Sequence, residues 1–457
     1  MRALLLPLAA ALLSHDAAAT LQRDELASSQ AFAIVRSLCD GVGPRLAGSP
    51  GDRAAVAWAL HEMPGLGLAN VHAEKVQVTH WERGEEHAEL IVPGAPPRPL
   101  AIAALGGSVG TPARGVEADV IEAASWQDLA GMGAEAIRGK IVFLDPIMRR
   151  ARDGRGYGET VRSRHVGARE AAKYGAVAMI LRSIGTDHDR LPHTGAKAKD
   201  DHEIPAAALS VPDAEALHRV LAEKRGVRVR LVMGARTLPP AESADVIGEV
   251  TGREKPGEVV VVGAHLDSWD QGTGAIDDGA GVAIALETGR LLAAMPQKPR
   301  RTVRIVLFAN EEHGLEGAKT YAKVHAAELG SHVAALEADF GADAVYAVRW
   351  RGDPAARERF DAIARLLAPL GVEQQKGDGE AGADVSPLLE AGVPVLDLRQ
   401  DGTRYFDFHH TANDTLDKVD PGVLAQAAAS FATAAWAAAE MDGDLGRVPD
   451  ALRKERW

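Results

Sequence analysis

One stretch of the sequence places metal-binding side chains directly after a strand. Residues 259–262 are four valines, a short apolar β-branched run that is typical of a strand buried on both faces. His265 and Asp267 follow the run, and Asp277 comes after a glycine-rich turn. Ligands in open α/β sheets bind at the carboxyl ends of strands, and histidine with aspartate suits zinc or a similar divalent ion. The stretch therefore predicts the first half of a metal site.

Three later segments carry further ligands of the same kind. Glu311 and Glu312 follow the apolar run 303–309, Asp339 follows the run 333–338, and His409 and His410 lie in a polar loop before the last helix. A single acidic strand end often does no more than cap the next helix. Four such clusters on one rim of a sheet predict a metal site.

The elements that must position these residues alternate along the second half of the chain. We expect strands at 244–250, 258–263, 303–309, 333–338 and 393–398, and helices at 281–295, 315–328, 353–368, 385–391 and 421–441. Nearer the amino terminus, helices are expected at 28–39 and 53–63, and strands at 71–78 and 87–92. This alternation predicts an α/β fold with a mostly parallel central sheet that helices cover.

Residues 111–238 have a pattern of short strand-like runs with a single helical stretch, which predicts a β-rich insert. Strands are expected at 118–123, 140–145, 177–182, 206–211 and 227–233, with one helix at 167–174. Within this insert, residues 139–144 and 171–180 resemble a protease-associated (PA) domain, and another small β-rich insertion is the alternative. His188, His193 and His202 lie among aspartates in a polar loop, and we interpret them as solvated residues rather than ligands.

Composition sets further limits. A net charge of −13 argues against nucleic acid or an anionic membrane as a partner. Arg2, the apolar run 3–13 and Ala17–Ala19 have the layout of a secretory signal peptide, so we expect a secreted or periplasmic protein. No later segment is expected to span a membrane. The single cysteine, Cys39, is expected to be buried and structural.

These motifs together resemble a known family. The series His265-x-Asp267, Asp277-Asp278-Gly279, Glu311-Glu312, Asp339 and His410-Thr411-x-x-Asp414-Thr415 is similar to that of the co-catalytic zinc exopeptidases, which include bacterial leucyl aminopeptidases and glutamate carboxypeptidases. Residues 43–50 also resemble the family's amino-terminal segment. After the signal peptide predicted at 1–19, the resemblance implies a catalytic domain in two parts, 20–110 and 239–457, with a PA-like insert at 111–238.

The resemblance also implies a ligand set for two zinc ions per chain. Asp277 would bridge the ions, His265 and Asp339 would complete one ion's ligands, and Glu312 and His410 those of the other. A shared carboxylate offsets the repulsion of two dications roughly 3.5–4 Å apart.

Other residues receive supporting roles from the same resemblance. Glu311 would be the general base. Asp267 would accept the second N–H of His265, or else cap a turn. His409 would stabilise an oxyanion or serve in packing, two roles that stay open. The family's Asp277–Asp278 peptide bond is cis, and Asp384 lies near a substrate-side loop with its role open.

The implied activity is hydrolysis of the terminal peptide bond in dipeptides or short peptides, most readily from the amino terminus, by an enzyme that resembles homodimeric relatives. A glutaminyl-cyclase-like acyltransferase with one zinc is disfavoured by the insert. A carboxypeptidase would need basic residues at the substrate carboxylate, for which Arg162, Arg164, Lys173 and Arg404 are candidates, or else plain surface charges. A binding module on an inactive peptidase fold would have lost ligands, whereas all five and the base are present.

Overall fold

The computed structural model describes residues 5–199 and 203–454, which fold into two compact units. The main unit comprises Met1–Val78, Glu242–Asp401 and Thr415–Trp457. The inserted unit comprises Thr79–Ala241 together with Gly402–Asp414. The loop that carries His409 and His410 is thus grouped with the insert, although it lies between two segments of the main unit in sequence.

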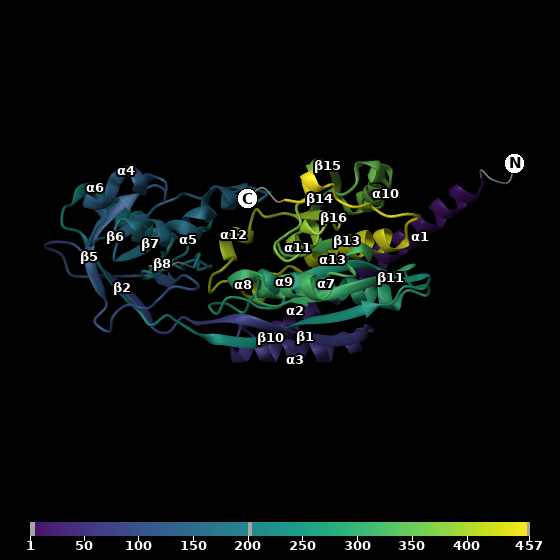
Figure 1. Cartoon of the computed structure of the whole chain (residues 1–457), viewed down its shortest axis with the longest axis horizontal. Coiled ribbons are helices and arrows are strands. Elements are labelled where there is room, and N and C mark those ends of the chain that lie inside the picture. The colour runs from purple at the N-terminus through teal and green to yellow at the C-terminus, as the bar shows by residue number, and fades with distance from the viewer. Residues whose placement is uncertain (1–4, 200–202, 455–457) are drawn as a thin grey trace. The chain divides into compact units, whose positions relative to one another are not determined.

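The main unit is built on a mixed sheet, and Figure 1 labels several of its strands. Within the described residues the strand order is β1-β10-β12-β11-β13-β16-β14-β15. Its strands are β1 (Ala69–Glu82), β10 (Arg236–Val250), β11 (Lys255–His265), β12 (Arg301–Phe308), β13 (His332–Glu337), β14 (Val345–Arg351), β15 (Glu373–Asp378) and β16 (Val395–Gln400). The four central strands, β12, β11, β13 and β16, are mutually parallel. Their carboxyl ends therefore lie on one rim, as the sequence predicted.

Alternating side chains of the central strands face two different helical layers. Val259 and Val261 pack in one core cluster with Ala318 and Leu388, which belong to α9 (Glu316–Val324) and α11 (Ser386–Glu390). Two further helices, α7 (Ala280–Ala294) and α13 (Pro421–Glu440), also pack on the sheet and contact each other. The remaining helices of this unit are α1 (Leu5–Ser28), α2 (Ala31–Gly41), α3 (Pro50–Gly65), α8 (Glu311–Gly314) and α10 (Arg357–Leu367). Burial on both faces explains the valine run of β11.

Helix α13 corrects one expectation from the sequence. Among the described residues it is the one helix long and apolar enough to cross a membrane by length and composition. From the sequence we expected no such segment after the amino terminus. The helix is nevertheless mostly buried, and it packs on α7 and α1. Its composition is that of a core helix.

The inserted unit has its own sheet, with the order β3-β2-β9-β5-β6-β7-β8-β4 in the part of the chain that the structure describes. Its elements are β2 (Glu86–Ile91), β3 (Arg98–Leu100), β4 (Ile102–Ala104), β5 (Val116–Ala123), α4 (Asp128–Ile137), β6 (Ile141–Leu144), α5 (Arg155–Lys173), β7 (Ala178–Arg182), β8 (Ala206–Leu209), α6 (Val211–Glu223), β9 (Arg228–Met233) and α12 (Tyr405–Phe408). Strands β5 to β8 are parallel neighbours. Because β2 pairs with β9 and β4 with β8, this unit extends beyond the predicted range 111–238.

The amino-terminal region is helical before and after the predicted signal-peptide cleavage site. Helix α1 continues to Ser28, and Ala18, Leu21 and Glu25 are buried in the main unit, where α1 packs on α13. A cleaved signal peptide stays a prediction. Cys39 on α2 is buried, as expected.

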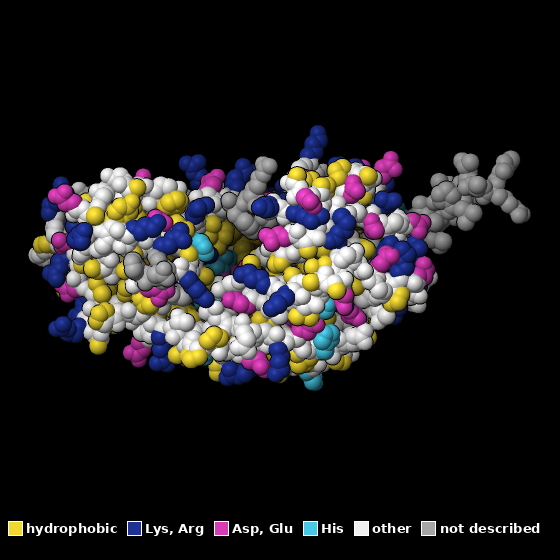
Figure 2. All heavy atoms as spheres, viewed as in Figure 1, with side chains coloured by type: hydrophobic (Ala, Val, Ile, Leu, Met, Phe, Trp, Pro, Cys, Tyr) yellow, Lys and Arg dark blue, Asp and Glu magenta, His cyan; other side chains and the backbone are white. Residues whose placement is uncertain are grey.

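On the face drawn in Figure 2, acidic and basic side chains are interspersed. The net charge of −13 is therefore not gathered into one acidic field on that face.

Candidate metal centre

Three of the predicted ligands lie at or just after the ends of adjacent parallel strands. His265 is the last residue of β11, Glu312 lies on α8 directly after β12, and Asp339 comes two residues after β13 ends. The fourth, Asp277, lies in the turn Ala275–Gly279 that leads into α7. The main unit thus brings four of the five predicted ligands to one rim of its sheet.

The ring of His265 is surrounded by carboxylates. Its Nε2 lies 3.0 Å from Oδ1 of Asp277 and 3.6 Å from Oδ1 of Asp339. Ligand atoms of His265, Asp277 and Glu312 lie within 4.8 Å of one another, and so do those of His265, Asp278 and Asp339. All of these side chains are buried except that of Asp339, which is partly buried. Such a donor set fits a divalent cation.

The environment shifts the protonation equilibria strongly. Burial lowers the pKa of His265, but the carboxylates of Asp339, Asp267 and Asp277 outweigh it and raise that pKa well above its usual value. Burial and the nearby carboxylates of Asp339, Glu312 and Asp267 raise the pKa of Glu311 well above its usual value, against the effect of His265. Positive charge placed among these carboxylates would offset their mutual repulsion.

Asp267 does not bind His265 in the predicted way. The Nδ1 atom of His265 lies 3.1 Å from the main-chain oxygen of Asp267 and 3.6 Å from its carboxylate. The carboxylate oxygen Oδ1 instead accepts a hydrogen bond of 3.0 Å from the main-chain N–H of Glu311. Asp267 therefore connects the loop after β11 with the loop after β12.

Two further residues of this centre have supporting contacts that the sequence did not reveal. Asp278 accepts hydrogen bonds from the main-chain N–H groups of His265, at 3.0 Å, and Gly281, at 3.1 Å. The indole N–H of Trp269 donates to Oε2 of Glu312 at 2.5 Å. A side chain at position 281 would collide with the carbonyl oxygen of Ala338, so this approach of α7 requires glycine. The Asp277–Asp278 peptide bond is cis, as the resemblance implied.

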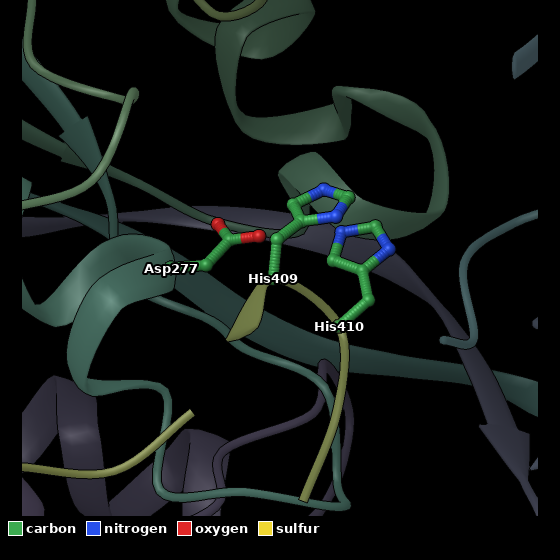
Figure 3. A group of neighbouring side chains, drawn as sticks. All are labelled: Asp277, His409 and His410. Atoms are coloured by element: carbon green, nitrogen blue, oxygen red, sulfur yellow. The ribbon is translucent and has the colours of Figure 1, made fainter. Parts of the chain in front are cut away.

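His409 and His410 are buried in the inserted unit, where their rings stack with centroids 3.5 Å apart. Figure 3 draws these two rings together with the side chain of Asp277. The Nδ1 atom of His410 lies 3.2 Å from the carbonyl oxygen of Thr194 and 3.3 Å from Nη1 of Arg164. Arg164 also donates to that carbonyl, at 3.3 Å. In one tautomer Nδ1–H of His410 donates to Thr194, and in the other Nδ1 accepts from Arg164. The first tautomer leaves the lone pair of Nε2 for a metal ion.

The interpretation of His193 as a solvated residue was wrong. Its side chain is buried, with Nδ1 2.7 Å from the carbonyl oxygen of His409 and Nε2 2.6 Å from Oδ1 of Asp187. His188 is exposed, as expected, and His202 lies outside the described residues. The difference follows from a contact with a segment 216 residues away in sequence, which a local pattern of polar residues does not reveal.

The four basic residues considered for a substrate carboxylate have other contacts. Arg164 is buried and donates to the hydroxyl of Tyr157 at 2.7 Å. Lys173 pairs with Glu170 at 2.8 Å. Arg162 lies over the ring of Trp126 and Arg404 over that of Phe408, each at 5.5 Å. Each of these side chains thus already has a partner within the inserted unit.

Comparisons with known proteins agree with this geometry. The sequence model of peptidase family M28 matches residues 245–435, a range that contains every predicted ligand. Carboxypeptidase Q of Mus musculus is 40% identical over 413 residues, which cover 90% of this chain and 86% of the mouse protein. The crystal structure of a peptidase M28 precursor from Shewanella amazonensis is 46% identical with a TM-score of 0.93, over 96% of this chain and 99% of that one.

A more distant structure agrees in fold. BSAP, a zinc aminopeptidase from Bacillus subtilis, is 20% identical with a TM-score of 0.66, over 93% of this chain and 98% of that one. The chain belongs to peptidase family M28, and the resemblance to co-catalytic zinc exopeptidases is confirmed. At the level of the family, this protein is a zinc-dependent exopeptidase.

Proposed function

We propose that this protein hydrolyses the terminal peptide bond of dipeptides or short peptides, as an aminopeptidase or dipeptidase that holds two zinc ions. The observation that carries the proposal is the group formed by His265, Asp277 and Glu312, which are buried, and Asp339, which is partly buried, with Glu311 beside it. Carboxylates that share a buried site repel each other unless protons or cations neutralise them. The donor set fits zinc, since it contains imidazole and carboxylate groups from a rigid sheet rim.

The ligands divide into two sets in this proposal. Asp277 would hold both ions, His265 and Asp339 would complete the ligands of the first, and Glu312 and His410 those of the second. Trp269 orients Glu312 through its indole N–H. In this proposal His410 donates its Nδ1–H to the carbonyl of Thr194, which lies 3.2 Å away, and keeps Nε2 for the metal ion.

When bound, zinc lowers the pKa of water toward about 7 and polarises the carbonyl of the scissile bond. Glu311 accepts the proton of the attacking water and returns it to the leaving amine. The hydrogen bond from its main-chain N–H to Asp267 holds Glu311 in place. His409 is proposed to donate to the oxygen that becomes negative as water adds to the carbonyl.

Carboxylates around the centre also favour a substrate with a free amino terminus, because they attract its ammonium group. We further propose secretion after removal of residues 1–19, a PA-like identity for the insert and a homodimer. The name of the mouse relative keeps a second candidate open, which is cleavage from the carboxyl terminus.

One experiment separates these possibilities. Zinc content and turnover are measured for wild type and Glu311→Gln on free dipeptides, amino-blocked peptides and carboxyl-blocked peptides. We expect two zinc ions in both proteins, a decrease of about 10²–10⁴-fold in kcat for the variant, and no cleavage of amino-blocked substrates. Cleavage of amino-blocked but not of carboxyl-blocked peptides would show a carboxypeptidase. A wild-type protein without zinc or turnover would contradict both candidates.

A further inference from the structure

Arg45 is a completely buried arginine that the mechanism above does not use. It lies in the segment between α2 and α3, and its relative exposure is 0%. An arginine in a protein interior is costly unless its charge and its five N–H donors are satisfied. The contacts of Arg45 therefore show which part of the fold its side chain stabilises.

All three guanidinium nitrogens of Arg45 bind main-chain carbonyls of one loop. Nε donates to Leu266 at 2.6 Å, Nη1 to Thr273 at 2.7 Å and Nη2 to Gly274 at 2.9 Å. The main-chain N–H of Arg45 donates to Oγ of Ser268 in the same loop, at 3.2 Å. One side chain thus binds both ends of the loop 266–274.

The position of this loop makes the contact relevant to metal binding. Leu266 is adjacent to the ligand His265, and Gly274 lies three residues before Asp277. Gly274 has a φ of +60°, and a side chain there would lie 2.4 Å from Cβ of Ser268 and 2.7 Å from Nη1 of Arg45. The loop therefore closes tightly around the guanidinium, and it joins His265 to the turn that carries Asp277.

We propose that Arg45 is a positioning residue for the zinc pair: it fixes the loop that joins His265 to Asp277 and thereby holds these two ligands in register. The inference rests on the proposed function, which makes both residues ligands. Ligands must be held to within about 0.5 Å for tight binding. A lysine at this position would offer a compact ammonium in place of the planar fork and would not reach three carbonyls in the same way.

The main unit offers a matched control. Arg301 is also buried, at 1% exposure, and its Nη1 and Nη2 donate to the carbonyls of Met441, at 2.8 Å, and Gly443, at 2.7 Å. It is the first residue of β12, whose other end precedes Glu311. Its Nε also donates to Oε2 of Glu258, at 2.5 Å. Arg301→Met therefore removes three side-chain hydrogen bonds, as Arg45→Met does, but one of them goes to a carboxylate and all lie at the rim opposite to the proposed site.

The experiment compares Arg45→Met, Arg45→Lys and Arg301→Met in the full chain. Zinc affinity is measured by competition with a chelator, and the melting temperature is measured on the metal-free proteins. We expect both Arg45 variants to bind zinc about 10–100-fold more weakly, while Arg301→Met loses stability but keeps its zinc affinity. Equal losses in all three variants, or unchanged affinity in Arg45→Lys, would overturn the inference. If Arg45→Met does not fold, the lysine variant decides.

His265→Ala separates this inference from the proposed function. Loss of zinc in His265→Ala with unchanged affinity in the Arg45 variants refutes only the role of Arg45. Unchanged zinc stoichiometry in His265→Ala refutes the proposed ligand set itself.

Discussion

The two histidines of the proposed zinc pair lie at the end of β11, beside the loop 266–274, and in the loop 402–414, and different parts of the chain hold these two loops. The loop 266–274 follows β11 and is held within the main unit by Arg45, through three main-chain carbonyls. The loop 402–414 is held within the inserted unit by side chains of that unit. Arg150 pairs with Asp407 at 2.6 Å, and His193 lies against the carbonyl oxygen of His409 at 2.7 Å.

The difference shows what each unit contributes to a metal site. Fixing one residue of an irregular loop costs about 1–2 kcal/mol of conformational entropy, so each loop needs partners outside itself. The main unit supplies them from the segment before α3, whereas the loop 402–414 obtains them from residues such as Thr186 and Thr194, whose N–H groups donate to Phe406 and His410. The insert is thus part of the structure that holds His410, whatever its role toward substrate.

The largest effects should come from removing His265, which directly precedes the first loop, or His410, which lies in the second. We expect His265→Ala and His410→Ala each to lose zinc and to lower kcat/KM by on the order of a thousandfold, because zinc supplies several kcal/mol of stabilisation to the reaction. Metal analysis and steady-state kinetics measure both. His188→Ala, an exposed histidine of the insert, is the control. Full zinc content in His410→Ala would show that the loop 402–414 supplies no zinc ligand.

A smaller effect should appear in the pH dependence of stability. Asp245 accepts a hydrogen bond from the N–H of Ala309, at the start of the loop that carries Glu311, and burial raises its pKa to about 8. Because the pKa of Asp245 is higher in the folded than in the unfolded protein, the protonated carboxyl group contributes to the free energy of unfolding. This contribution is complete below about pH 4 and is lost as the pH rises through about 8. Asp245→Asn, neutral at every pH, should remove this slope, a difference of at least about 2 kcal/mol.

Urea unfolding of the metal-free proteins at a series of pH values measures this difference. If the free energies of unfolding of wild type and Asp245→Asn run parallel from pH 4.5 to pH 8, the buried carboxyl group does not contribute in this way. The result would also show whether a group outside the metal centre makes the stability of the main unit depend on pH.

The smallest effect is expected for the partner of the second loop. His193→Ala removes the hydrogen bond to the carbonyl of His409 and should weaken zinc binding about tenfold. Asn can place an amide N–H near the position of Nδ1, so His193→Asn should restore most of the affinity. Chelator competition measures both, and Arg182→Met, which breaks the buried pair with Asp145 elsewhere in the insert, is the control. An equal loss in Arg182→Met would show only a general destabilisation.

The sequence predicted the central part of the fold well, because the central strands have local signals. The apolar runs of β11, β12, β13 and β16 indicate burial on both faces, and each is found within a few residues of its predicted position. β14 and β15 were missed. β15 is a polar edge strand with the sequence EQQKGD, and it forms through main-chain pairing with β14 rather than through an apolar pattern.

The sequence by itself determined which residues could bind metal, because ligand chemistry is a property of residue type and because parallel strands bring their carboxyl ends to one rim. Only the tertiary structure decided how those residues are held. Arg45 binds a loop more than 200 residues away, His193 contacts a loop 216 residues away, and the carboxylate of Asp267 accepts a hydrogen bond from the main-chain N–H of Glu311. Such contacts leave no local pattern, because the free energy of burying a charged side chain depends on the partners that folding brings to it.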